Sequence, residues 1–160
     1  MIVMDNYKIE DLLFEELILF DLEAKNYEEV INKIGKYAEK KGFVEHGFAE
    51  AVIKREKLYP TALPTEVLKV AIPHPMERNT IKKSAIIIAK LKEPVNFTLM
   101  GSDTDQVPVD IVFTLAVDGG EHQLTILQEL VGLFSEPKSM QKIAQANNPK
   151  EMIQTLKELL

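Results

Sequence analysis

The segment Lys69-Val70-Ala71-Ile72-Pro73-His74-Pro75-Met76 constrains the fold of this chain more than any other. Its apolar part, Val70-Ala71-Ile72, predicts a short buried strand, and a histidine between two prolines follows directly. Each proline fixes its own φ near about −65° and lacks a backbone N–H group, and each biases the preceding residue toward extended geometry. The segment therefore excludes a helix and predicts a stiff strand end that carries an imidazole out of a sheet.

Two interpretations of His74 follow from its residue type and position. In open α/β sheets, ligands and reacting groups gather at strand ends, which favours a chemical role for this imidazole. The alternative is that the prolines only end an aggregation-prone strand and that His74 is a solvated turn residue, since short motifs also occur by chance. The segment alone leaves both interpretations open.

Apolar runs and helical periodicity alternate along the rest of the chain. Strands are predicted at 17–20, 68–73, 84–89 and 109–117, with a weaker edge candidate at 95–97. Helices are predicted from a cap at Asn26 to Gly42, from Gly47 to Arg55 or Lys57, from Glu121 to Phe134, over 137–146, and after a cap at Asn148. This order predicts a single domain over residues 1–160, a three-layer α/β/α sandwich with a mixed central sheet of about five strands and helices on both faces.

Composition excludes several classes of function. The formal net charge is −6, which argues against non-specific nucleic-acid binding. There is no cysteine, hence no disulfide, thiolate nucleophile or zinc–sulfur site, and a cytoplasmic location is expected. Residues 1–5 lack the pattern of a secretory signal, and no apolar stretch approaches the roughly 20 residues that span a bilayer.

His122 and Arg55 are the other candidates for chemistry. His122 lies in the first turn of a predicted helix, where free amides and a partial positive charge suit an anion. If the strands before His74 and His122 are parallel neighbours, both imidazoles face one crevice. Arg55 ends a predicted helix and offers a planar fork for two phosphate oxygens. The alternatives are that His122 only caps its helix and that Arg55 is a solvated charge at a helix end.

The remaining polar residues give weaker signals. The third histidine, His46, is assigned no role, and the spacing of the three histidines does not favour a metal site. Asp103 and Asp105 can bind a cation but are more typical of turns. The sequence contains neither a glycine-rich phosphate loop nor a G-x-S-x-G nucleophile motif.

Taken together, these motifs resemble a known family. They are Arg55-Glu56, a proline- and threonine-rich loop, Val70-Ala71-Ile72-Pro73-His74, the run 108–116 and His122-Gln123-Leu124. This set resembles the enzyme IIA domain of the fructose–mannitol class of the phosphoenolpyruvate-dependent sugar phosphotransferase system, or PTS. The form Tyr59-Pro60-Thr61-Ala62-Leu63-Pro64-Thr65 is similar to the galactitol-type branch. Other members carry glycines where this chain has Glu66-Val67-Leu68-Lys69, and glycine would supply positive φ at low cost.

The resemblance implies a role for each candidate. His74 would accept a phosphoryl group from the phosphocarrier protein HPr, through Nε2 as a tele-phosphohistidine, and pass it to a cysteine of a IIB component. His122 would stabilise or orient the phosphoryl group, and Arg55 would offset its charge. No cofactor and no metal is implied, and the membrane component IIC would be an indirect partner.

Three residues, Leu63, Ile72 and Met76, are expected to surround the site as an apolar contact area for these proteins. Two alternatives to a sugar-specific carrier stay open. One is a regulatory, nitrogen-type protein whose phosphorylation state controls a partner. The other is an α/β scaffold that is never phosphorylated.

Overall fold

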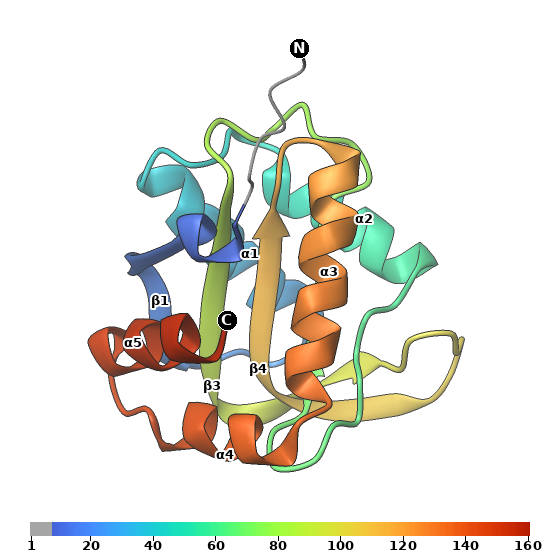
Figure 1. Ribbon diagram of the computed structural model, residues 1–160. Coiled ribbons are helices and arrows are strands. Elements are labelled where there is room, and N and C mark those ends of the chain that lie inside the picture. The colour runs from blue at the N-terminus through green and yellow to red at the C-terminus, as the bar shows by residue number, and fades with distance from the viewer. Residues whose placement is uncertain (1–7) are drawn as a thin grey trace.

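A four-stranded sheet lies between two layers of helices in the computed structural model of this chain (Figure 1). The structure describes residues 8–160, so the prediction that residues 1–5 are not a secretory signal lies outside the described part. The predicted α/β sandwich with helices on both faces is confirmed. Over the described residues the sheet has four strands rather than about five.

The strand order is β1-β3-β4-β2, with β1 parallel to β3, β3 antiparallel to β4, and β4 parallel to β2. The strands are β1 (Leu13–Leu22), β2 (Val70–Ala71), β3 (Ala85–Thr98) and β4 (Gln106–Ala116). A 3₁₀ helix at Ile9–Leu12 precedes β1, and the α-helices are α1 (Tyr27–Lys40), α2 (Phe48–Leu58), α3 (Gly120–Phe134), α4 (Pro137–Gln145) and α5 (Pro149–Leu159).

Two hydrophobic cores lie on the two faces of the sheet. Side chains alternate along β3, so Ile86 and Ile88 pack on one face while Ile87 and Ala89 pack on the other. The first core includes residues of α3, α4 and α5, and the second includes residues of α1 and α2; Figure 1 shows the two helix layers before and behind the sheet. A strand covered on both faces needs apolar residues in succession, which explains the isoleucine-rich run of β3.

The predicted fifth strand at 95–97 is wrong, because these residues continue β3. Val95 pairs with Val109 of β4, as Lys90 pairs with Ile111 earlier in the same strand, and a register shift separates the two pairs. Pro94 lies within that shift, where a residue without an N–H group does not interrupt the ladder. The polar residues around Pro94 concealed the continuity of the strand.

The strand predicted at 68–73 is limited to Val70 and Ala71. The chain still runs beside β4 beyond that point, since the N–H of Leu115 donates to the carbonyl of Pro73 at 2.9 Å. Pro73 has no N–H group to return a bond, so the regular ladder ends before it. On the other side of β2, Leu63 exchanges backbone bonds with Val70 at 2.8 and 3.2 Å.

Predicted helix boundaries are confirmed within a residue or two. The Asn26 side chain accepts a hydrogen bond from the N–H of Glu29 at 2.8 Å, and Asn148 caps α5 in the same way through Glu151 at 2.9 Å. Gly42 has a φ of 84° after the end of α1, as predicted. None of the helices in residues 8–160 combines the length and apolarity needed to span a membrane.

The loop before β2 holds an unusual backbone conformation. Val67, one of the residues at the place where glycines were expected, has a φ of 72°. A β-branched residue pays a steric cost in this left-handed region because its Cβ crowds the backbone. Val67 therefore adopts the left-handed backbone conformation that is usual for glycine, although it is not a glycine.

Candidate functional site

His74 lies directly beyond the end of β2, but its ring does not project into solvent. Only 3% of the residue is exposed, so the predicted protruding imidazole is wrong. The backbone hydrogen bond from Leu115 to Pro73 holds the segment before His74 against β4. Pro73 also keeps the preceding residue, Ile72, extended. The strand end is stiff as predicted, yet it lies beneath neighbouring elements instead of standing free of them.

The hydrogen bonding of His74 fixes which of its ring nitrogens carries a proton. Nδ1 lies 2.8 Å from the carbonyl oxygen of Ile72. A carbonyl can only accept, so Nδ1 is the donor and carries the hydrogen. Burial, and secondarily the positive charge of Arg55, lowers the pKa of His74 from 6.5 to about 4. The ring is therefore neutral at pH 7, with an unprotonated Nε2.

His74 and Arg55 line one pocket, which has a volume of about 410 Å³. Its walls come from the end of α2 with the loop after it, the segment that follows β2, the turn between β3 and β4, and α3. The other lining residues are Leu58, Tyr59, Pro60, Thr61, Ile72, Met100, Gly101, Ser102, Asp103 and Leu127. Four separate segments thus meet around one imidazole and one guanidinium, a convergence that suits binding of an anion.

Arg55 is held near the pocket by the residue that ends its own helix. Its Nη1 donates to the carbonyl oxygen of Tyr59 at 3.2 Å, and its guanidinium carbon lies 5.3 Å from the centre of the Tyr59 ring. Partial burial lowers the pKa of Arg55, although the group stays charged at any physiological pH. The hydrogen bond to the Tyr59 carbonyl uses one nitrogen of the Arg55 guanidinium, and the other N–H groups remain as donors for a ligand.

His122 lies in the first turn of α3, as predicted. Strands β2 and β4 are parallel neighbours, with Val70 opposite Ile111, so the segments that carry His74 and His122 leave the same edge of the sheet. His122 is not among the residues that line the pocket of His74 and Arg55. The structure thus brings two of the three predicted site residues into one pocket and places the third at the same sheet edge.

The apolar surroundings of the pocket differ from those predicted. Ile72 lines it, whereas Leu63 packs against a hydrophobic core and the exposed Met76 is not among the lining residues. Exposed Leu58, Tyr59 and Met100 take their place beside the half-buried Leu127. These residues come from the ends of α2 and β3 and from α3, segments that no local sequence pattern connects.

Glu56 and Thr61 were missed by the sequence analysis. Glu56 is only 4% exposed, and its carboxylate accepts hydrogen bonds from the Thr61 N–H at 2.8 Å and the Thr61 hydroxyl at 2.9 Å. Burial, opposed by these bonds and by Arg55, raises the pKa of Glu56 from 4.5 to about 7. A signal existed in the sequence, because Glu56 follows Phe48 and Val52 at four-residue intervals on the buried side of α2.

The aspartates of the β3–β4 turn have a modest part. Ser102, not an aspartate, caps the turn, since its hydroxyl accepts from the N–H groups of Thr104 at 3.2 Å and Asp105 at 2.9 Å. Asp103 adds a carboxylate to the pocket lining. Within residues 8–160, no three or more histidine, aspartate or glutamate side chains are grouped as a metal site would require.

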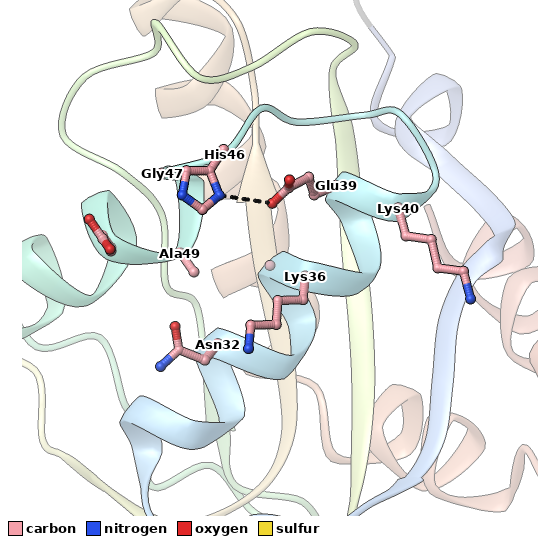
Figure 2. A pocket seen from close by; sticks show the side chains of 9 residues that line it. Asn32, Lys36, Glu39, Lys40, His46, Gly47 and Ala49 are labelled. Atoms are coloured by element: carbon pink, nitrogen blue, oxygen red, sulfur yellow. Dashed lines mark ion pairs between the residues drawn. The ribbon is translucent and has the colours of Figure 1, made fainter.

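A second pocket, of about 420 Å³, lies between α1 and α2 (Figure 2). His46, to which the sequence assigned no role, stands at its rim and pairs with Glu39 across 3.7 Å. The His46 side chain is 93% exposed, so water screens this pair. The groove has neither a buried charge nor the convergence of segments found around His74, and we place the candidate site at His74.

A comparison with family models matches residues 11–159 to the family described as "Phosphoenolpyruvate-dependent sugar phosphotransferase system, EIIA 2". The chain is 35% identical over 109 residues to the galactitol-specific EIIA component of Escherichia coli K12, covering 68% of this chain and 71% of that protein. It is 27% identical over 151 residues to the mannitol-specific EIICBA component of Buchnera aphidicola subsp. Acyrthosiphon pisum, covering 91% of this chain and 23% of that protein. The chain thus spans less than a quarter of the latter protein.

Solved structures show the same fold. The IIA chain in the complex of enzyme IIAMTL and phosphorylated enzyme IIBMTL from Escherichia coli has a TM-score of 0.74 at 24% identity, over 91% of this chain and 97% of that one. The nitrogen regulatory protein IIA-Ntr from Neisseria meningitidis has a TM-score of 0.74 at 25% identity, over 92% of this chain and 98% of that one. The arrangement of sheet and helices is therefore shared by proteins with different described roles.

Proposed function

Because this chain belongs to the EIIA 2 family of the phosphoenolpyruvate-dependent sugar phosphotransferase system, we propose that it is a sugar-specific IIA component of the galactitol type. His74 accepts a phosphoryl group from phospho-HPr and passes it to a cysteine of a cognate IIB component. The 35% identity to the galactitol-specific EIIA component of Escherichia coli supports this type. The reaction takes place in the cytoplasm, and the membrane component IIC is an indirect partner that binds the sugar.

The protonation state of His74 suits it to act as the nucleophile. Its Nδ1–H is bonded to the Ile72 carbonyl, so the lone pair of Nε2 attacks the phosphorus atom. A new P–N bond forms while the P–N bond in phospho-HPr breaks, and the donor nitrogen leaves with the bonding pair. The proton on Nδ1 stays in place, and the product is a tele-phosphohistidine. A neutral ring is ready to react without losing a proton first.

Arg55 offsets the negative charge that arrives with the phosphoryl group. Phosphoryl transfer depends mainly on position and on electrostatic stabilisation, and a guanidinium in a partly dry pocket is more effective than one in water. In the second step the sulfur of the IIB cysteine attacks phosphorus, a P–S bond forms, and the P–N bond to His74 breaks. His122 orients the phosphoryl group for this step from the first turn of α3.

The apolar residues around the pocket give the two partner proteins a common contact area. Leu58, Tyr59 and Met100 are exposed at its rim. HPr and IIB must both bring a phosphorylated or accepting side chain to His74, so they use the same rim in turn. Transient complexes of this kind rest on a few apolar contacts with a polar surround.

One observation carries the proposal: a neutral histidine with a bonded Nδ1 shares a pocket with an arginine. The test is to incubate the purified chain with phosphoenolpyruvate, enzyme I and HPr and to measure acid-labile phosphate. We expect labelling of the wild-type chain and none of His74→Ala, with loss of the label when a IIB protein is added. Labelling that is unchanged in His74→Ala would overturn the assignment.

A second candidate function is regulation of a partner protein by phosphorylation state. The structural likeness to the nitrogen regulatory protein IIA-Ntr of Neisseria meningitidis favours it. The two functions differ in the fate of the phosphoryl group. Rapid transfer to a IIB protein supports the carrier, whereas a phosphorylated chain that keeps its label in the presence of IIB supports the regulator.

A further inference from the structure

A chain of buried hydrogen bonds leads from α2 to the ring of His74. Glu56 accepts the N–H of Thr61 at 2.8 Å and the hydroxyl of Thr61 at 2.9 Å. The hydroxyl oxygen of Thr61 in turn accepts the N–H of Ile72 at 3.0 Å, and the carbonyl of Ile72 accepts Nδ1–H of His74 at 2.8 Å. All four residues are buried, so each bond lies where a missing partner is costly.

In this series of hydrogen bonds, the donor and the acceptor of each bond follow from the groups involved. The N–H of Ile72 can only donate, so the Thr61 oxygen uses a lone pair there and gives its single hydrogen to Glu56. The hydroxyl of Thr61 therefore requires an acceptor on the other side, which the Glu56 carboxylate supplies. A carboxylate with two bonds to one threonine fixes both the backbone and the side chain of that residue.

We propose that Glu56 and Thr61 are positioning residues that hold Ile72 so that its carbonyl keeps the proton of His74 on Nδ1 and leaves Nε2 as the reacting atom. The inference rests on the proposed function in taking His74 as the phosphoryl acceptor. Glu56 and Thr61 are given this role through Ile72, although Thr61 also lines the pocket of His74 and Arg55. They act on Ile72, whose carbonyl sets the tautomer of the imidazole, in the way that a second layer of hydrogen bonds orients histidine in many sites.

The local geometry makes this dependence specific. Ile72 precedes Pro73, so its φ and ψ are already narrowed by the proline, and its N–H has no partner in the β2–β4 ladder. The Thr61 hydroxyl is the acceptor that this N–H has instead. Without it, the Ala71–Ile72 peptide can rotate to seek another acceptor. Because that peptide is joined at the Cα of Ile72 to the peptide that carries the Ile72 carbonyl, the rotation shifts this carbonyl away from the ring.

The charge of Glu56 adds a pH dependence that separates this role from simple packing. The ionisable groups facing Glu56 are Tyr27 of α1, Arg55 and Lys57 of α2, and Asp103 of the β3–β4 turn. The pKa of Glu56 is about 7, whereas that of His74 is about 4. An ionised Glu56 accepts both bonds from Thr61, while a protonated one brings a competing O–H donor. The rate of phosphorylation therefore rises with pH through about 7.

The variants isolate the two links. Thr61→Val keeps the shape of the side chain and removes the hydroxyl, Thr61→Ser keeps the hydroxyl, and Glu56→Gln keeps the shape and removes the charge. Glu50→Gln is the matched control, since it removes an exposed carboxylate from the same helix. Circular dichroism and thermal unfolding establish that each variant is folded. If Glu56→Gln does not fold, Thr61→Val and Thr61→Ser decide the question.

Two readouts test the proposal. Long-range ¹H–¹⁵N spectra of the unphosphorylated chain report the tautomer of His74, and we expect Nδ1–H alone in wild type, Thr61→Ser and Glu50→Gln. In Thr61→Val and Glu56→Gln we expect the Nε2–H form to appear, with phosphorylation by phospho-HPr about tenfold slower, the consequence of one lost buried bond. The rise in rate near pH 7 should vanish in Glu56→Gln and persist in Glu50→Gln.

The opposite results would overturn the inference. A folded Thr61→Val with the wild-type tautomer and rate would exclude Thr61 as a positioning residue, and a wild-type pH profile in Glu56→Gln would exclude Glu56. The tautomer measurement needs no phosphoryl donor. Failure of the wild-type chain to accept phosphate would therefore contradict the proposed function, while an unchanged tautomer would contradict this inference alone.

Discussion

Arg55 and His74 line the same pocket, and the positive charge of Arg55 lowers the pKa of His74 in addition to the larger effect of burial. The guanidinium thus acts on the imidazole before any phosphoryl group is present. It favours the neutral ring, which is the form that the proposed phosphoryl transfer requires. In the proposed transfer the same charge also offsets the negative charge of the phosphoryl group.

Replacing Arg55 with Gln should therefore have two effects. The pKa of His74 should rise from about 4 but stay below 6.5, because burial, the main cause of the shift, remains. The rate of phosphorylation should fall about 10- to 100-fold as the charge-assisted contact is lost. An NMR titration of the His74 ring and a single-turnover labelling experiment measure the two quantities. A pKa that stays at its wild-type value would show that the two groups are not electrostatically coupled.

Replacing His122 with Ala should impair onward transfer more than initial phosphorylation. His122 lies at the same sheet edge as His74 but does not line the pocket that holds the unphosphorylated ring. Its expected work is on the phosphorylated state. The two steps are measured separately, as labelling by phospho-HPr and as loss of label to a IIB protein. Near-wild-type rates for both steps would contradict the role given to His122.

Glu56→Gln should change how stability depends on pH. The folded-state pKa of Glu56 is raised to about 7, from an ordinary 4.5, so the folded chain binds the proton more tightly than the unfolded chain does. The stability contributed by this group is fully present below about pH 4.5 and is lost as pH rises through 7. Relative to Glu56→Gln, the wild type should lose about 3 kcal/mol over that interval, as measured by urea unfolding at a series of pH values.

The pKa of His74 is shifted in the opposite direction to that of Glu56, so His74 serves as an internal control for this experiment. Its folded-state pKa is lowered to about 4 from 6.5, so its contribution is present above 6.5 and is lost as pH falls through 4. In Glu56→Gln, stability should rise with pH between about 4 and 6.5, whereas in His74→Gln it should fall. Parallel pH profiles for the two variants would contradict the opposite shifts of these two groups.

Val67→Gly should stabilise the chain by about 1 kcal/mol. Val67 holds a φ of 72° and is 48% exposed, so glycine relieves backbone strain while little buried surface is lost. Val67→Ala keeps a Cβ and should gain less. Thermal unfolding of the three proteins measures the difference. An equal gain in the alanine variant would mean that the β-branch, and not the left-handed backbone, is the source of the strain.

Gly35→Ala should destabilise the contact between α1 and α2 by about 1–3 kcal/mol. A Cβ at Gly35 would lie 2.7 Å from the Cβ of Ala49, closer than two carbon atoms can approach. Adding Ala49→Gly removes the nearest of these atoms and should restore part of the loss. Denaturant unfolding of the two single variants and the double variant tests the contact. Losses that simply add would place the effect of Gly35→Ala outside this helix pair.

The sequence determined much of this molecule because its signals are local. The prolines around His74, the caps at Asn26 and Asn148, and the isoleucine-rich run at 84–89 each act through neighbouring residues. The strand end, the two capped helices and the first part of β3 form there as predicted. The same signals predicted the sandwich and the family. Even the conformation of Val67 follows a local logic, since glycine was expected where a left-handed residue is found.

Tertiary structure alone decided how the site is built. Whether His74 stands in solvent or lies beneath other segments depends on α2, α3 and the β3–β4 turn, which meet only when the sheet is assembled. The hydrogen bond from the Ile72 N–H to the Thr61 hydroxyl joins two residues that no sequence pattern connects. Hydrogen bonds and desolvation depend on distances between atoms remote in the chain, so the tautomer and pKa of the imidazole are properties of the fold.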